Sequence, residues 1–143
     1  MPYRYLDDIA TADVAFAAEG TTVEELFASC AAALLNVMVD NPEGVEPRKE
    51  VTITVGQPEL DLLLFAFLQE LIFYKDARRL LLRPVSVAVA QGEEGFRLHA
   101  VTAGERVDPA RHHLGVDVKA VTLHLFRVER TTAGWEATVV LDV

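Results

Sequence analysis

Acidic residues near both ends of the sequence are the first group whose type and spacing could do chemistry. Asp13 lies close to the start, Asp142 is the second residue from the end, and the α-carboxylate of Val143 adds another anion beside it. If the first and last strands are neighbours, these groups converge, and their charges repel one another unless a cation neutralises them. Oxygen ligands favour Ca²⁺ or Mg²⁺. The alternative interpretation is that these residues are solvated acids at the chain ends.

Basic and imidazole side chains form the second group. Lys119 opens an apolar strand and could neutralise an acid, hold a phosphate or protect a sheet edge from aggregation. His124 lies within the same strand and could be a hydrogen-bonded sheet residue or a functional one. The adjacent pair His112 and His113 would point in opposite directions on an extended chain, which is poor geometry for chelating one metal. We therefore interpret that pair as solvated residues of a polar loop.

Several classes of function are disfavoured by what the sequence lacks. It contains no phosphate-binding glycine loop, nucleophile elbow or paired zinc motif. Cys30 is the only cysteine, so neither an intrachain disulfide nor a cysteine-based zinc site can form. With 13 basic and 22 acidic residues the net charge is −9, and no run of Lys and Arg offsets it. We therefore expect no direct binding to nucleic acid, because a phosphate backbone would be repelled.

Two features of the sequence bear on the cellular location, the N-terminal segment and the most apolar segment. No basic segment followed by an apolar stretch opens the sequence, which argues against a secretory signal. The most apolar segment, residues 60–73, contains charged residues and is shorter than the roughly 20 residues that a membrane-spanning helix needs. We expect a cytoplasmic protein that does not enter a membrane.

The elements that would position these groups belong to one domain covering residues 1–143. Alternating or β-rich patterns predict strands near residues 3–18, 51–55, 85–89, 96–101, 119–128 and 135–141. Thr22 and Glu25 form a capping box that opens a first amphipathic helix, which should end before Pro42. The order of elements predicts an α+β fold, a two-layer and largely antiparallel sheet with two helices packed on one face.

The second helix, expected from about Pro58 to Arg78, is apolar nearly all round. Such a helix is either central in the core or partly covered by a partner protein. Gly92, Gly95, Gly104 and Gly115 have the appearance of turn residues. The segment 104–115 is accordingly expected to be a polar loop.

Four stretches of the chain resemble the archease family along nearly its whole length. They are Thr11-Ala12-Asp13-Val14, residues 20–27, residues 119–124 (Lys-Ala-Val-Thr-Leu-His), and residues 135–143. The third and fourth are the more specific, because any capped amphipathic helix resembles the second. One departure is Ala10, which stands where the family's motif has a histidine; Asp8 is a candidate replacement acid.

The resemblance implies an accessory protein of the tRNA-splicing RNA ligase, which joins 2′,3′-cyclic-phosphate and 5′-hydroxyl ends. Such a protein promotes formation of the ligase–guanylate intermediate and repeated turnover, and is not itself an enzyme. The resemblance also implies a divalent-metal site made by Asp13 and Asp142, with Val143 supplying oxygen. Asp8, Lys119 and His124 are candidate auxiliary residues. Two alternatives remain open, a small metal-dependent phosphoester hydrolase and a general protein chaperone.

Overall fold

The structure is a computed structural model that describes residues 2–7 and 13–143. Asp8 and Ala10, which the sequence analysis singled out, lie outside the described residues. The elements in chain order are β1 (Tyr3–Tyr5), β2 (Val14–Gly20), α1 (Val23–Met38), the short 3₁₀ helix η1 (Pro42–Gly44), β3 (Lys49–Gln57), α2 (Leu60–Arg78), β4 (Leu80–Gly92), β5 (Gly95–Arg106), β6 (Ala120–Thr131) and β7 (Gly134–Asp142).

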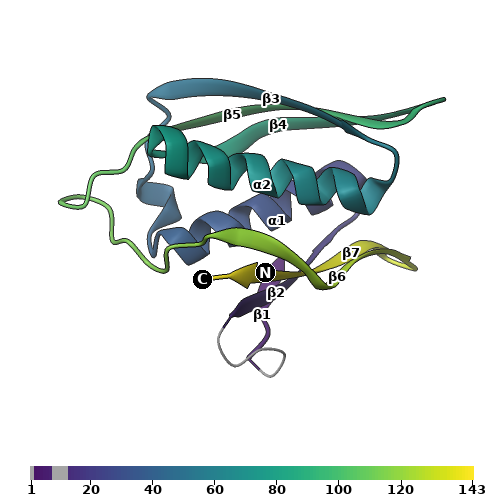
Figure 1. Cartoon of the computed structure of the whole chain (residues 1–143), viewed down its shortest axis with the longest axis horizontal. Helices are drawn as coiled ribbons and strands as arrows, with labels where there is room; N and C mark the ends of the chain where they lie inside the picture. The colour runs from purple at the N-terminus through teal and green to yellow at the C-terminus, as the bar shows by residue number, and fades with distance from the viewer. Residues whose placement is uncertain (1, 8–12) are drawn as a thin grey trace.

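The strands divide between two antiparallel sheets. One sheet has the order β1-β2-β7-β6 and the other has the order β3-β5-β4. Figure 1 shows both helices lying between them, so the fold has three layers. The α+β class, with two helices packed on antiparallel strands, is confirmed. The strands differ from the prediction in forming two sheets, one on each side of the helices, instead of a single sheet.

The composition of α2 explains why two sheets are needed. A helix that is apolar nearly all round must be covered on more than one side, and α2 packs against β3, β4 and β5 on one side and β6 on the other. Phe27 of α1 stacks on Phe67 of α2, with ring centroids 6.2 Å apart. The residues of α2 that are buried are Leu63, Leu64, Phe67, Leu68, Leu71 and Ile72. Each such side chain stabilises the fold by about 1.5–3 kcal/mol.

The surface of α2 is only partly apolar. Leu62 and Phe73 are exposed, at 36% and 49%, while Phe65 packs edge-on against Phe126 of β6. Core burial therefore accounts for most of the apolar character that the sequence showed, and two large side chains remain on the surface. No helix within the described residues is long and apolar enough to cross a membrane.

The start of α1 follows its sequence signature. The Thr22 hydroxyl accepts from the main-chain N–H of Glu25 (3.1 Å), and the Glu25 carboxylate accepts from the N–H of Thr22 (3.2 Å). These two bonds satisfy donors that the first turn would otherwise leave free. The hydrogen bond from Thr21 is the main reason that the pKa of Glu25 is lowered. The predicted capping box is confirmed.

The segment after β5 departs from the sequence prediction. Strand β5 continues to Arg106, so Gly104 lies inside a strand and not in a turn. A Cβ atom at Gly104 would lie 1.7 Å from the carbonyl oxygen of Leu81, so only glycine lets β4 and β5 approach this closely. The interpretation of Gly104 as a turn residue is therefore wrong. The sequence does not distinguish the two cases, because a turn and a close contact between strands both favour glycine.

Candidate functional site

The pairing of β2 with β7 positions the acidic residues predicted to bind a metal. Val14 pairs with Leu141 in an antiparallel register. Asp13 immediately precedes this pair and Asp142 immediately follows it, so the two acids would lie opposite each other if the register continued by one residue. Directly paired Cα atoms in antiparallel strands lie about 4.5–5.5 Å apart. The prediction that the two strands are neighbours is confirmed.

Strand alternation sets the face on which these acids lie. Leu141 is buried in the core against the helices, and Val14 packs against the same core. Successive side chains of a strand point to opposite faces, so Asp142 lies on the outer face of the four-stranded sheet. Asp142 is exposed and Asp13 is half-buried.

The first residues of β6 hold the main chain beside Asp142. Ala120 pairs with Asp142, and the N–H of Lys119 donates to the carbonyl oxygen of Asp142 (2.8 Å). Lys75 of α2 also reaches this region, because its ammonium group donates to the carbonyl oxygen of Val118 (2.6 Å). Lys119 is therefore beside Asp142 through its main chain, and its own side chain is exposed.

The remaining predicted residues have different places. His124 is exposed and lies in the stretch of β6 that leaves the register with β7, between Thr122 and Arg127. The structure does not place it beside the two acids through strand pairing. The side chain of Val143 packs against the core. The use of Val143 oxygens as ligands stays a prediction.

The donor set can be compared with the needs of a divalent ion. Carboxylate oxygens of Asp13 and Asp142 are hard ligands of the kind that Ca²⁺ and Mg²⁺ prefer. Thr122 pairs with Val140, two residues before Asp142, and its buried Oγ1 atom has no hydrogen-bond partner in the described part of the chain. No three His, Cys, Asp or Glu residues within ranges 2–7 and 13–143 gather closely enough to hold an ion. The two acids fit a hard cation, and further ligands would be water or groups of a partner.

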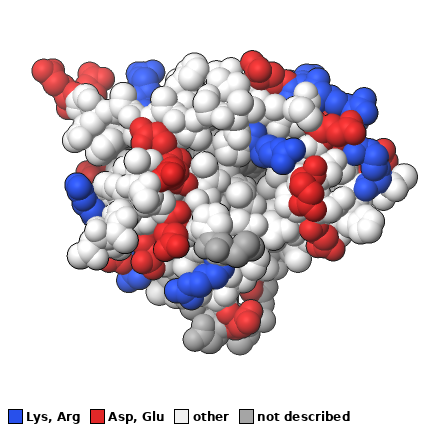
Figure 2. Space-filling view, turned by 180° about the vertical axis from the view of Figure 1, so that it is seen from behind, with Lys and Arg blue, Asp and Glu red and all other residues white. Residues whose placement is uncertain are grey.

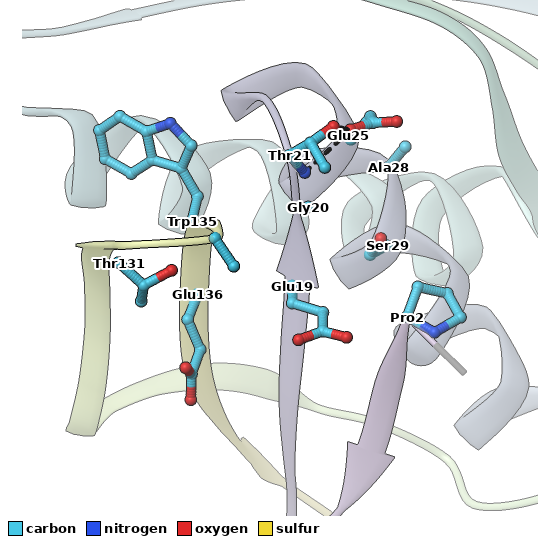
Figure 3. A pocket seen from close by; sticks show the side chains of 11 residues that line it. Pro2, Glu19, Gly20, Thr21, Glu25, Ala28, Ser29, Thr131, Trp135 and Glu136 are labelled. Carbon is cyan, nitrogen blue, oxygen red and sulfur yellow. Dashed lines mark hydrogen bonds between the residues drawn. The ribbon is translucent and has the colours of Figure 1, made fainter.

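A hollow of about 630 Å³ lies at the opposite end of the same two strands (Figure 3). Glu19 of β2 is directly opposite Glu136 of β7, and Figure 3 shows both carboxylates on the same side of the sheet. Like charges placed opposite each other destabilise a strand pair. Trp135 lines the hollow and lies under the guanidinium of Arg130, with 5.7 Å to the ring centroid. The sequence analysis missed the glutamate pair, because it depends on strand register.

A buried polar cluster joins the end of β5 to the following loop. Glu105 is 5% exposed and His112 is 2% exposed. The Glu105 carboxylate accepts from the main-chain N–H of Glu46 (2.6 Å) and from the guanidinium of Arg111, and lies 3.2 Å from Nε2 of His112. The bond from Arg111 is the first cause that lowers the pKa of Glu105 to about 2, followed by weaker hydrogen bonds that oppose the effect of burial.

The hydrogen bonds of His112 define its tautomer. Its Nδ1 atom accepts from the main-chain N–H of Asp108 (2.9 Å), so the ring proton is on Nε2 and points to Glu105. The interpretation of His112 as a solvated loop residue is wrong, while His113 is exposed as expected. The side chains of His112 and His113 do point in opposite directions, but that of His112 points into the protein.

The model of the Archease protein family (MTH1598/TM1083) matches residues 3–143. The chain belongs to the archease family. Curated archeases with full-length similarity include that of Methanosarcina mazei, 35% identical over 142 residues with 99% of this chain and 95% of the relative covered. The archease of Thermococcus gammatolerans is 38% identical over 134 residues, covering 93% and 94% of the two chains.

Solved structures agree with this family membership. The solution structure of protein 1598 of Methanobacterium thermoautotrophicum matches with a TM-score of 0.86 and 29% identity, covering 99% of both chains. The crystal structure of an archease and possible chaperone from Thermotoga maritima matches with a TM-score of 0.65 over 94% and 93% of the two chains. That second match, at 21% identity, supports the fold alone. Archeases are generally considered accessory, non-catalytic proteins.

Three of the four archease-like stretches meet at one end of the four-stranded sheet. Asp13 precedes β2, residues 119–124 open β6, and residues 135–142 form β7 and end beside both. The fourth stretch, residues 20–27, opens α1 at the far end of β2. The stretches 20–27 and 135–143 also adjoin at that far end, where Gly20 pairs with Trp135, so the family resemblance extends over the whole length of these strands.

Proposed function

We propose that this chain is a non-enzymatic activator of the tRNA-splicing RNA ligase, which joins 2′,3′-cyclic-phosphate and 5′-hydroxyl RNA ends. In this function it promotes formation of the ligase–guanylate intermediate and thereby allows repeated turnover. Membership of the archease family supports the partner. The pairing of Val14 with Leu141 is the single observation that supports the site, because Asp13 and Asp142 are the next residues along these two strands.

Asp13 and Asp142 would hold the divalent ion, Ca²⁺ or Mg²⁺. When bound, the ion supplies positive charge of the kind that neutralises developing charge on a phosphate in nucleotidyl transfer. The chain's own contribution is to keep two carboxylates on the outer face of a sheet, where a partner can reach them. The hydrogen bond from the Lys119 amide to Asp142 fixes the backbone there.

The net charge supports a protein partner with a basic surface. At −9 the chain is complementary to the cleft of an enzyme that binds RNA, and such complementarity accelerates association and favours the correct partner. Figure 2 shows acidic side chains distributed over much of one face of the molecule.

A ligation time course with the ligase of the same organism tests the proposal. The ligase is kept well below the RNA concentration, so product beyond one equivalent reports repeated turnover. The wild-type chain should increase that product in the presence of Mg²⁺ or Ca²⁺, and Asp13→Asn or Asp142→Asn should remove the increase without lowering the melting temperature. Glu94→Gln is the matched control, because Glu94 is exposed in the turn between β4 and β5.

Two outcomes would replace this proposal. Full stimulation by both aspartate variants would show that the acids are not needed and that the partner is engaged elsewhere. Hydrolysis of simple phosphoesters by the purified chain, lost in the same variants, would favour the hydrolase alternative. The exposed side chains of Leu62 and Phe73 favour the chaperone alternative, and suppression of the aggregation of unrelated proteins would measure it.

A further inference from the structure

A basic hollow lies at the end of the molecule where α2 and β5 finish and β3 and β4 begin. It has a volume of about 970 Å³. We define it by its six basic residues, which come from separate segments of the chain. They are Arg48, Lys49, Arg78, Arg79, Arg106 and Arg111. The chain has 13 Lys and Arg residues in all, so nearly half of them line one hollow.

Three acids also line the hollow, and neighbours on the protein already neutralise two of them. Glu105 accepts from Arg111 and lies 3.6 Å from Arg48. Asp76 is paired with Lys75 at 2.6 Å. Asp108, the third acid, accepts from the main-chain N–H of Ala110.

Four bases of the hollow remain available to a ligand. They are Lys49, Arg78, Arg79 and Arg106, which are exposed and form no ion pair or side-chain hydrogen bond with another described residue. The hollow thus carries an excess of positive charge on a chain whose total is −9. Glu46 pairs with Arg48 at 2.6 Å beside the hollow and offsets part of this excess, whereas salt screens acids farther away than about 8 Å. Figure 2 shows basic side chains gathered at the upper right, the end that lies on the left in Figure 1.

The backbone of Arg79 supplies an independent observation. Arg79 caps α2 in the left-handed conformation, with φ 55° and ψ 39°. Glycine is the usual residue at such a position, because a side chain there costs about 1–2 kcal/mol. Helix-end stabilisation accounts for Lys75 and Arg78 in the last turn of α2. It does not account for a strained arginine, or for Lys49 and Arg106 on neighbouring strands.

We propose that the basic hollow binds the phosphate backbone of single-stranded RNA. Guanidinium groups bind phosphate oxygens with paired hydrogen bonds. The free cations come from β3, α2 and β5, and this spread suits a chain of several phosphates better than a single phosphate group. No aromatic residue lines the hollow, so the described lining offers no platform on which a base could stack. We therefore expect contacts to phosphates alone and an affinity that does not depend on base sequence.

The hollow and the acidic site lie at the same end of the molecule. Lys75 joins them, since it contacts Asp76 beside the hollow and Val118 next to the start of β6. A ligase that meets Asp142 would bring its RNA substrate towards this end. That assignment of the RNA to the ligase rests on the proposed function, whereas binding itself is a property of the isolated chain and is tested without the ligase.

Fluorescence anisotropy of a labelled 12-nucleotide RNA with the isolated chain tests the inference, in two sequences and at several salt concentrations. Lys49→Gln, Arg79→Gly and Arg106→Gln should each weaken binding about two- to fivefold. Each should also reduce the slope of log affinity against log salt by about 0.7, the value for one lost contact to a single strand. Arg97→Gln is the control, because it removes the same charge from the other end of β5.

Arg79→Gly separates loss of binding from loss of folding. Glycine relieves the left-handed conformation, so this variant should melt at the wild-type temperature or higher while it binds RNA more weakly. Competition with GTP shows whether the hollow prefers the phosphates of RNA or those of a free nucleotide. Displacement of the RNA by micromolar GTP would assign the hollow to a nucleotide and overturn the proposal. Absence of RNA binding, or equal weakening by Arg97→Gln, would also overturn it.

Discussion

Replacing Glu105 with glutamine should lower the free energy of unfolding near neutral pH and should have little effect near pH 2. The carboxylate is nearly buried, at 5% exposed, and its two oxygens accept from Arg111, the main chain of Glu46 and the ring of His112. Glutamine removes the charge and replaces one acceptor with a donor. A donor in that position faces other donors, so at least one hydrogen bond is lost.

The magnitude follows from the pKa of Glu105, which Arg111 above all lowers from 4.5 to about 2. One pKa unit corresponds to about 1.4 kcal/mol, so the whole difference sets an upper limit of about 3.4 kcal/mol. The Arg111 and Arg48 side chains are 40% and 68% exposed, and water screens their charges. We therefore expect about 1–2 kcal/mol. Because the folded state lowers this pKa, the stabilisation is complete above about pH 4.5 and is lost as the pH falls towards 2.

Urea unfolding followed by the fluorescence of Trp135 measures this effect at pH 7 and at pH 2.5. At pH 7 the thermal midpoint should also fall, by about 2–8 °C for a chain of this size. Glu94→Gln serves as the control, because the same change in the exposed turn should alter stability little at either pH. An equal loss of stability at pH 7 and pH 2.5 for Glu105→Gln would refute the reasoning, since the charge of the carboxylate would then contribute nothing.

Three further changes have expected outcomes. Gly104→Ala should lower the free energy of unfolding by about 3 kcal/mol, since its Cβ would lie 1.7 Å from the Leu81 oxygen. An unchanged midpoint of thermal unfolding would mean that β4 and β5 can move apart at no cost. The Cys30 thiol, whose pKa burial raises, should react with a thiol reagent only in denaturant, and fast labelling of the native chain would contradict its burial. Thr22→Ala should lower the unfolding free energy by about 1 kcal/mol through loss of its cap to Glu25, whereas no change would show that α1 starts without it.

Features that depend on a few neighbouring residues could be predicted from the sequence. The capping box of Thr22 and Glu25 was one, and the turn at Gly92 and Gly95 between β4 and β5 was another. In each case the hydrogen bonds or the backbone conformation lie within about four residues. The neighbourhood of Asp13 and Asp142 was also predicted, because both flank strands whose acidic ends suggested a common site.

Features that depend on how a segment packs in the folded protein were missed. His112 was taken for a solvated residue, although Glu105 and the amide of Asp108 hold it inside the protein. Gly104 was taken for a turn residue, although the nearby backbone of Leu81 is what requires glycine. For Gly104 the deciding partner is a separate segment. The partners of His112 lie only four and seven residues away, but the loop that carries them is held against Glu46 and Gly44 of another segment, and no local pattern shows this.

The sequence by itself determined the helices, most of the strands and the archease family, because periodicity, caps and motifs are written in consecutive residues. The tertiary structure alone decided that the strands form two sheets on either side of the helices. It also decided that Lys49, Arg79 and Arg106 share one hollow on an acidic chain. Both outcomes depend on which strands pair and pack, and that choice is governed by burial summed over the whole core rather than by any local pattern.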